Sequence, residues 1–432
     1  MTERFVVQVD ADRFDSLARP NSGARAQYFF GWNRWGRGGY LSSRAAREFL
    51  IALWILVAVS PSAAGAVVAI AAPGFERPSS PPRLEPATPG AQLWASIYDA
   101  PGGSGDSANA VAVAPDSSIA FVTGWSSTGD ENDPNYATVA YDTRTGAERW
   151  VAFYDAPEPQ PSGDEPRAIA VAPDGSRVFV TGSSADQDGL GDFATVAYDA
   201  STGAEQWVSR YTGGGGSDDG ATSIAVSPDG TRVLVAGQGT AGDYITVAYD
   251  ASSGAELWAS RFDGGGEGAF AVTVGADGSA VYVTGGSVEY ILQGFSTIAY
   301  NASTGAQLWV QRGGPGVLYD VGVSPDGSQV FVTGYVEQSG HRNDYVTIAY
   351  RSSSGIQQWR RQYDGPDHNF DEAAALDVAP DGSALYVTGR SKSLLTYSDY
   401  ATMAYSAKTG ARLWVSLYDA HPAGSTAGRI SR

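Results

Sequence analysis

From residue 91 onward, short segments of alternating apolar and polar residues follow one another at close intervals. Residues 168–174 (AIAVAPD), 177–182 (RVFVTG), 193–199 (FATVAYD) and 204–211 (AEQWVSRY) form one such series of four. Alternation with a period of two over four to eight residues is typical of β-strands with one face toward a core. The pattern therefore predicts an all-β fold that is built from four-stranded antiparallel units.

Two kinds of turn separate the four strands of a unit. The third strand of the unit above leads into the fourth through Ala-Ser-Thr-Gly at 200–203. Between the first and second strands lies a Pro-Asp turn, in which proline presets φ, aspartate bonds its own backbone and a following glycine accepts positive φ. Because this turn occurs six times, it predicts six units; its copies are Pro115-Asp116, Pro173-Asp174, Pro228-Asp229, Pro325-Asp326, Pro380-Asp381 and the degenerate Ala276-Asp277.

Tryptophan recurs once in each unit, at intervals of 50 to 57 residues. A repeat of this length without helical periodicity is typical of a β-propeller. Because a buried tryptophan covers about 150–250 Å², we expect these side chains to join neighbouring blades rather than to bind a ligand. The tryptophans are Trp94, Trp150, Trp207, Trp258, Trp309, Trp359 and Trp414.

The segment between the third and fourth strands carries the motif A-x-D-x-x-T-G-x-x-x-W at residues 140–150 and 197–207, and later copies keep its glycine and tryptophan. This motif resembles the tryptophan-docking repeat of the pyrroloquinoline-quinone-type propellers, which include quinoprotein dehydrogenases and an outer-membrane assembly lipoprotein. The Pro-Asp-Gly turns also resemble the YVTN-type propeller repeat. The resemblance covers residues 91–419 and implies a propeller, but enzymes and scaffolds share this fold. The motif glycines are Gly146, Gly203, Gly254, Gly305, Gly355 and Gly410.

Residues 91–99 (AQLWASIYD) form an additional fourth strand that no third strand precedes. The last unit already has its own fourth strand at 411–419. The additional strand therefore adds at an edge, displaces the C-terminal strand or belongs to a degenerate seventh blade. We expect six full blades, with seven as the alternative, over residues 91–420, followed by a tail at 421–432.

The first ninety residues differ in composition from the repeats. Residues 1–48 contain eight arginines and five acidic residues, and an apolar stretch follows at 49–72. This stretch is interpreted as a signal peptide or, alternatively, as a signal anchor, because 24 residues can span a hydrocarbon core of ~30 Å. Residues 73–90 are rich in proline and predict an extended linker. Under either interpretation the propeller lies outside the cytoplasm, either secreted, periplasmic or anchored with the propeller facing outward.

Charge and composition exclude several function classes. The chain has 28 basic and 47 acidic residues, a net charge of −19, which argues against nucleic-acid binding. It has no cysteine, which excludes disulfides, thiolate metal sites and thiol catalysis. The vicinal cysteine pair that the resemblance to quinoprotein dehydrogenases would imply is therefore also missing. Neither a G-x-S-x-G nor an H-E-x-x-H motif occurs.

The connections fall on two faces of the predicted ring, because successive turns of an antiparallel meander alternate between faces. One face carries the uniform turns, whereas the other carries connections that vary in length and composition, among them a loop predicted at 313–318. Variable loops on a rigid scaffold concentrate binding residues, so the second face is the candidate binding surface. Its acidic residues are Asp130, Glu131, Asp133, Glu158, Asp164, Glu165, Asp218, Asp219 and Glu267.

Two residue sets on this face are candidates for metal binding. Asp186, Asp188 and Asp192 follow Ser184 with the spacing of a calcium loop. The alternative for them is a solvated loop, because Asp192 has counterparts before an aromatic residue at Asp243, Asp344 and Asp399. A second set could converge from adjacent loops, or its proximity could be coincidental; it contains His341, His368, Asp367 and Asp371. We expect no other cofactor.

These observations favour an exported, monomeric propeller without catalytic activity, which binds a protein, a glycan or a component of the cell envelope through its variable acidic face. Membrane contact is expected only through residues 49–72, if they are not cleaved. The alternative is a propeller enzyme, either a quinone- or calcium-dependent oxidoreductase or a lactonase-like hydrolase, with its site at the central channel.

Overall fold

The structure, a computed structural model, describes most of the predicted repeat region and a few segments before it. The described residues are 5–10, 53–54, 67–70, 92–100, 105–127, 134–156, 163–185, 190–213, 219–239, 242–263, 268–286, 294–338, 342–392 and 398–418. Strands joined by tight turns make up these residues, which confirms the all-β class. Within them, no helix has the length and apolar character needed to cross a bilayer.

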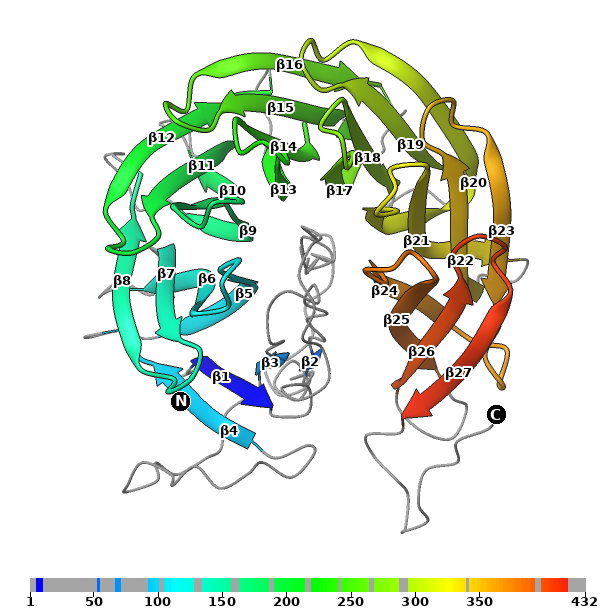
Figure 1. Cartoon of the computed structure of the whole chain (residues 1–432), viewed down its shortest axis with the longest axis horizontal. Helices are drawn as coiled ribbons and strands as arrows, with labels where there is room; N and C mark the ends of the chain where they lie inside the picture. The colour runs from blue at the N-terminus through cyan, green and yellow to red at the C-terminus, as the bar shows by residue number, and fades with distance from the viewer. Residues whose placement is uncertain are drawn as a thin grey trace, which may run out of the picture.

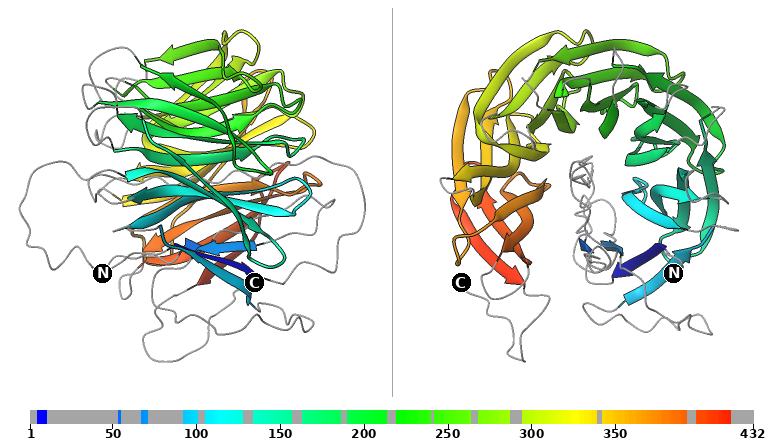
Figure 2. Two further views of the ribbon diagram at one scale, coloured as in Figure 1. Left: turned by 90° about the vertical axis from the view of Figure 1, so that its left-hand side faces the viewer. Right: turned by 180° about the vertical axis from the view of Figure 1, so that it is seen from behind.

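Six antiparallel blades follow one another around a central axis (Figures 1 and 2). Blade 1 consists of β5 (Asp106–Val113), β6 (Ile119–Ser127), β7 (Pro134–Asp142) and β8 (Glu148–Tyr154). Blade 2 consists of β9 (Glu165–Val171), β10 (Arg177–Ala185), β11 (Gly191–Asp199) and β12 (Glu205–Tyr211). Blade 3 consists of β13 (Gly220–Val226), β14 (Arg232–Gln238), β15 (Tyr244–Asp250) and β16 (Glu256–Phe262).

The second half of the ring repeats this order with one exception. Blade 4 begins with β17 (Gly268–Val274), β18 (Ala280–Gly286) and β19 (Gly294–Asn301), and β20 (Gln307–Val323) serves as its fourth strand and as the first strand of blade 5. Blade 5 continues with β21 (Gln329–Gln338), β22 (Arg342–Arg351) and β23 (Gln357–Tyr363). Blade 6 consists of β24 (Asp371–Val378), β25 (Ala384–Lys392), β26 (Ser398–Ser406) and β27 (Arg412–Tyr418).

The continuity of β20 corrects the sequence-based prediction of a loop at 313–318. The glycines there suggest a turn, but Gly316 pairs with Val336 and Val317 with Tyr335, so the chain passes from one blade to the next as a single strand. Only glycine fits at these two positions. A Cβ on Gly313 would collide with Phe295, and one on Gly316 would collide with the backbone of Tyr335. Blades 4 and 5 therefore form one sheet of seven strands.

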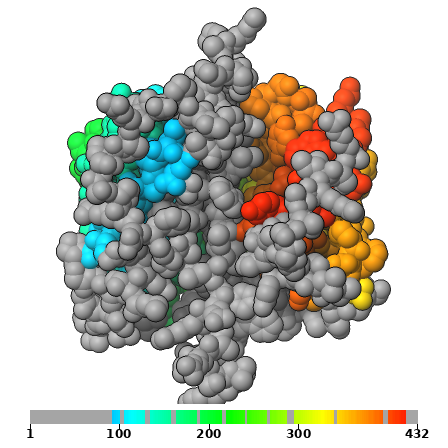
Figure 3. Space-filling model, turned by 90° about the horizontal axis from the view of Figure 1, so that it is seen from below, coloured from blue at the N-terminus to red at the C-terminus, as the bar shows by residue number. Residues whose placement is uncertain are grey.

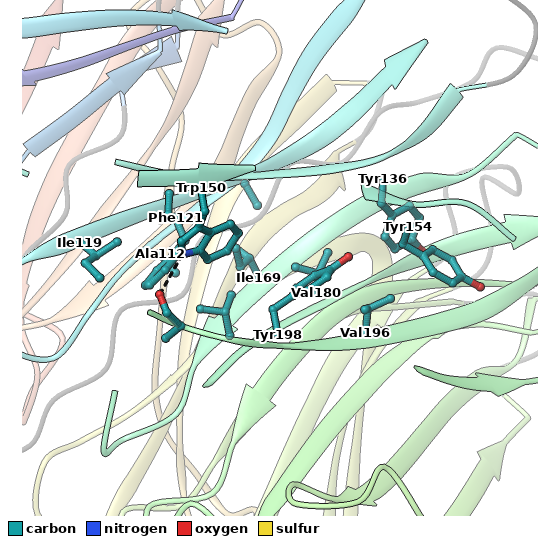
Figure 4. Packing of buried hydrophobic residues seen from close by; sticks show 14 of the residues in the cluster. Ala112, Ile119, Phe121, Tyr136, Trp150, Tyr154, Ile169, Val180, Val196 and Tyr198 are labelled. Atoms are coloured by element: carbon teal, nitrogen blue, oxygen red, sulfur yellow. Dashed lines mark hydrogen bonds between the residues drawn. The ribbon is translucent and has the colours of Figure 1, made fainter. Parts of the chain in front are cut away.

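The hydrophobic core lies between the blades. At the interface of blades 1 and 2, Trp150 packs between Phe121 of its own blade and Tyr198 of the next, with ring centroids 5.7 and 6.3 Å apart (Figure 4). Its indole N–H donates to the carbonyl of Ala200 at 3.0 Å. Truncation of such a buried tryptophan costs about 3–5 kcal/mol, so each indole contributes substantially to the contact between two blades.

The same contact recurs at six positions, because each tryptophan lies over the motif glycine of the next blade. A Cβ on any of these glycines would come within 2.6–2.8 Å of the indole. All six have φ between 65° and 73°, a region that favours glycine. The predicted structural role of tryptophan and glycine fits these contacts; the pairs are Trp94–Gly146, Trp150–Gly203, Trp207–Gly254, Trp258–Gly305, Trp309–Gly355 and Trp359–Gly410.

The additional fourth strand, β4 (Gln92–Tyr98), does not add to blade 6. It pairs with β1 (Phe5–Asp10) in a separate sheet of order β2-β3-β1-β4, which also contains β2 (Leu53–Trp54) and β3 (Val67–Ile70). Trp94 of β4 docks on blade 1 by donating to the carbonyl of Thr143. Only β2 and β3 of the apolar stretch 49–72 are described, and the rest of it lies outside the described residues.

The two faces of the ring differ in the lengths of their connections. On one face, which we call the turn face, every connection spans five residues: 114–118, 172–176, 227–231, 275–279, 324–328 and 379–383 after first strands, and 143–147, 200–204, 251–255, 302–306, 352–356 and 407–411 after third strands. On the opposite face, the loop face, the connections after second strands vary from three to seven residues: 128–133, 186–190, 239–243, 287–293, 339–341 and 393–397.

Candidate functional site

The aspartates of the turn face bond within the turns themselves. In blade 2, the Asp199 carboxylate accepts hydrogen bonds from the backbone and hydroxyl groups of Ser201 and Thr202, at 2.7–3.0 Å. These bonds lower the pKa of Asp199. Asp174 bonds Ser176 in the same way in the first turn of the blade. These aspartates therefore stabilise the turns to which they belong.

On the loop face, part of the predicted acidic surface is buried. Asp164 and Asp219 are 0% and 2% exposed, and each accepts a backbone N–H from the connection before it, Ala156 at 2.9 Å and Gly213 at 2.7 Å. Burial raises the pKa of Asp164 to about 6. These two aspartates stabilise the passage between blades, which corrects their prediction as surface residues. Glu165 pairs with Arg167 at 2.9 Å, and the other acidic residues named for this face lie outside the described residues.

Three carboxylates converge where the connections of blades 5 and 6 meet. Oxygens of Asp344, Asp364 and Asp371 lie within 4.8 Å of one another, and Nδ1 of His368 lies 2.6 Å from Oδ2 of Asp364. Asp371 is fully buried and accepts the N–H of Gly365 at 2.7 Å and the hydroxyl of Ser391. We call Asp344, Asp364 and Asp371 the blade 5 cluster. It borders a cavity of about 290 Å³ that Gln338 and Arg342 also line.

Electrostatic repulsion within the cluster affects how its members titrate. Burial raises the pKa of Asp344, and the negative charges of Asp364 and Asp371 raise it further. Burial also raises the pKa of Asp371, although its bonds to Ser391 and Gly365 oppose this effect. A bound cation would reduce the repulsion between these carboxylates. Suitable cations are a divalent metal that prefers oxygen ligands and the side chain of a lysine or arginine.

In blade 2, Asp192 occupies the position of Asp344, and an arginine neutralises its charge. Arg210 pairs opposite Ala194 as Gln362 pairs opposite Val346, so these two residues are equivalent. In blade 2, Nη2 of Arg210 lies 3.7 Å from the Asp192 carboxylate, and Thr212 donates its hydroxyl to the same carboxylate at 3.2 Å.

Blade 3 repeats the pairing of blade 2, since Arg261 bonds Asp243. In blade 5, a glutamine replaces the arginine at 362, and Asp364 takes the place of the threonine. The blade 5 cluster therefore has more negative charge than its equivalent in blade 2.

Only some residues of the two metal sites predicted from the sequence lie among the described residues. Asp186 and Asp188 of the proposed calcium loop, and His341 of the second set, lie outside the described residues. Asp192, the third residue of that loop, contacts Arg210 and Thr212. Of the second set, His368 and Asp371 do belong to one neighbourhood. Sequence reasoning missed Asp344 and Asp364 as its partners, because the two aspartates lie in different segments of the chain and only the fold brings them together.

The first strand of every blade contains a bulge at the same position. The residue that follows the bulge pairs with a threonine of the second strand or, in blade 3, with Ala236. The bulged residue differs between blades: Asn109 donates to the carbonyl of Pro166 at 2.7 Å, and Thr222 donates to that of Ala269 at 2.9 Å. After the bulge of blade 5 follows Asp320, whose Oδ2 accepts the N–H of Leu376 at 2.7 Å. These residues join the inner strands of neighbouring blades.

Known proteins resemble the chain in sequence and in fold. The family model described as outer membrane protein assembly factor BamB matches residues 192–379 and 241–431, which together make up more than half of the chain. Among solved structures, the hydrazine synthase of Kuenenia stuttgartiensis has a TM-score of 0.50 and 18% identity, covering 69% of this chain and 76% of that chain. This likeness shows the fold alone. No curated protein matches the sequence.

Proposed function

Because the chain belongs to the family described as outer membrane protein assembly factor BamB, we propose that it is an extracytoplasmic propeller that binds a protein partner through its loop face. The name of that family refers to assembly, which is a role in protein interaction. Export would depend on residues 49–72, acting as a signal peptide or as an anchor.

The contrast between the two faces is the observation that carries this proposal. Turns of constant length, whose aspartates bond within the turn, suit a structural rim. Loops of variable length suit recognition, because they can change without disturbing the blades. The blade 5 cluster and its cavity lie on this second face.

Charge indicates the chemistry of the partner. The chain has a net charge of −19, and the blade 5 cluster lacks the arginine that pairs with Asp192 and Asp243 in other blades. A partner segment with exposed lysine or arginine would therefore be attracted to this face and would associate faster at low ionic strength.

Site-specific photo-crosslinking in the native host tests the proposal. A photoreactive residue at exposed Arg342 on the loop face should give an adduct of defined mass, whereas one at exposed Lys408 on the turn face should give none. The adduct should weaken when Asp344→Asn and Asp364→Asn are introduced together. Equal adducts from both faces, or adducts only from Lys408, would contradict the proposal.

A further inference from the structure

Three aromatic side chains meet near the loop-face end of blades 4 and 5. The ring centroids of Phe270 and Tyr319 lie 5.5 Å apart at an interplanar angle of 77°, and those of Tyr319 and Tyr335 lie 5.9 Å apart at 47°. None of the three residues is fully buried, so part of each is accessible to solvent. We call these three residues the aromatic cluster.

Strand bulges place two of the three rings. Phe270 and Tyr319 are the bulged residues of β17 and β20, and Tyr335 lies on the neighbouring strand β21. A bulge redirects the side chain of the extra residue. The bulged residues of the other blades are not aromatic; they are Asn109, Arg167, Thr222 and Ala374. Packing within a blade therefore does not require the aromatic cluster, which points to a role of its own.

A polar group without net charge borders the aromatic cluster. Arg390 donates from Nε and Nη2 to Oε2 of Glu372 at 3.0 and 2.6 Å, and Asn343 donates from Nδ2 to Oε1 at 2.7 Å. Glu372 lies on β24, on the inner side of the arc of blades (Figure 1), and blade 6 is visible at the molecular surface in orange and red (Figure 3). Because Arg390 balances the charge of Glu372 and both carboxylate oxygens are occupied, this group favours an uncharged ligand.

Two hydrogen-bond donors face such a ligand. Burial raises the pKa of Tyr335 to about 12, the negative charge of Glu372 raises it further and the positive charge of Arg390 opposes this increase. The hydroxyl of Tyr335 is therefore protonated at neutral pH, and the ion pair lies close to it. Arg390, whose side chain is 56% exposed, uses Nε and Nη2 for Glu372, so its Nη1 can donate as well.

We infer that the aromatic cluster binds a proline-rich segment of the protein partner in the polyproline II conformation. Proline supplies an apolar ring and has no N–H, and the carbonyls of this helix accept no bond within the segment. Aromatic side chains hold such rings, while Tyr335 and Arg390 donate to the carbonyls. The inference rests on the proposed function, because it names the chemistry of the partner segment. It adds an uncharged contact beside the blade 5 cluster, since Glu372 follows Asp371 in the chain.

Calorimetric titration with acetylated and amidated decaproline tests the inference. Decaproline has no charge and forms the polyproline II helix in water, whereas a glycine-serine peptide of the same length is a flexible coil. The full chain should bind decaproline with a Kd below about 1 mM and the glycine-serine peptide about tenfold more weakly. The Kd for decaproline should be similar at low and at high salt. Absence of saturable binding, or equal binding of the two peptides, would overturn the inference.

Variants locate the binding on the aromatic cluster. Tyr335→Ala should weaken decaproline binding about tenfold, and Tyr335→Phe, which keeps the ring and loses the hydroxyl, should weaken it roughly threefold. Trp125 occupies the same position on β6 of blade 1, where the bulged residue is Asn109. Trp125→Ala is therefore the matched control and should leave the affinity unchanged. If Tyr335→Ala fails to fold, Tyr335→Phe carries the test, and an unchanged affinity in that variant would refute the site.

Two further measurements separate this inference from the proposed function and from a saccharide site. The Asp344→Asn and Asp364→Asn pair should leave the affinity for uncharged decaproline unchanged, although it weakens the crosslink from Arg342. A retained crosslink without decaproline binding would overturn the inference alone, whereas decaproline binding without any crosslink would contradict the proposed function. Aromatic rings also stack on sugars, so cellohexaose is titrated in parallel. Binding of cellohexaose instead of decaproline, with loss in Tyr335→Ala, would assign the aromatic cluster to a glycan and overturn the inference.

Discussion

At the scale of single residues, the contact between an indole and a glycine explains why each repeat keeps both. A glycine in the left-handed region satisfies two requirements, positive φ and the close approach of the ring. Gly175 and Gly203 separate these requirements, because both have φ of 73° but only Gly203 lies under a tryptophan.

Gly203→Ala should therefore destabilise the protein more than Gly175→Ala. A Cβ at 203 would lie 2.7 Å from Cδ2 of Trp150, whereas the nearest atom to a Cβ at 175 is Cδ of Pro115 at 3.5 Å. Both variants lose roughly 1–2 kcal/mol through backbone strain, and Gly203→Ala loses about 1–3 kcal/mol more through overpacking. Urea unfolding measures both losses, and equal losses would show that the indole contact contributes nothing.

A second effect at this scale concerns Asp320, which is 9% exposed between blades 5 and 6. Burial raises its pKa to about 7, despite its bonds to the N–H groups of Leu376 and Val321. Because the pKa is higher in the folded than in the unfolded chain, unfolding releases a proton between these two values. The contribution of Asp320 to stability is therefore complete below the unfolded pKa and is lost as the pH rises through the folded pKa of about 7.

Asp320→Ser should reduce this pH dependence. Blade 3 has Ser223 at the same position, and its hydroxyl accepts the N–H of Val272 at 2.8 Å, so serine can keep the bond to Leu376. The difference obtained by subtracting the Tm of the native protein from that of the variant should increase from pH 4 to pH 7. Calorimetry at both pH values measures the difference, and a constant difference would refute the assignment.

At the scale of elements, the blades are one template whose positions are filled differently. The hydroxyl pairs of the second and third strands recur, as in Thr181–Thr195 at 2.9 Å and Thr333–Thr347 at 3.1 Å. The third position after the tryptophan of the fourth strand differs, since it is Arg210 in blade 2 and Gln362 in blade 5. The repeats therefore share the residues through which strands pair and differ where loops meet, which is how blade 5 acquires an acidic junction.

Gln362→Arg should stabilise the protein, because it restores the cation that blade 2 places beside Asp192. A partly exposed ion pair contributes about 0.5–1 kcal/mol, which corresponds to a rise in Tm of roughly 2 °C at low salt. Gln358→Arg, on the same strand and with the same change in charge, is the control and should have little effect. The gain should shrink as salt is added. A gain that is equal for both variants would reflect net charge rather than the cluster.

At the scale of the whole molecule, the ring separates a rim of uniform turns from a face of variable loops. The turns also carry the carbonyls that accept the indoles, such as that of Ala200. A change in the length of a turn therefore disturbs a blade interface, whereas a change in a loop does not break this contact.

Insertion of Gly-Gly-Ser after residue 339, in a loop-face connection, should change the free energy of unfolding by less than about 1 kcal/mol. The same insertion after Ser201 should cost more, because it separates Asp199 from Thr202 and displaces Ala200 from Trp150. Thermal unfolding of both variants measures the contrast. Equal tolerance at the two sites would contradict the distinction between the faces.

Much of the fold could be predicted from the sequence because its determinants are local. Alternation sets the strands, the Pro-Asp and Thr-Gly turns set their ends, and a tryptophan once per repeat joins each blade to the next. The strand β20 was predicted wrongly for a physical reason. Gly313 and Gly316 are typical of a loop, but here they allow the close approach of Phe295 and of the backbone of Tyr335.

By itself, the sequence determined the class of the fold, the six blades and the tryptophan that joins each blade to its neighbour, since each depends on residues close together in the chain or repeated at a fixed interval. Only the tertiary structure decided which aspartates are buried, as Asp164 is, and which meet, as Asp344 and Asp371 do. Burial and repulsion depend on distances between connections of different blades. These distances follow from how neighbouring blades pack against one another, which the pattern within one repeat does not encode.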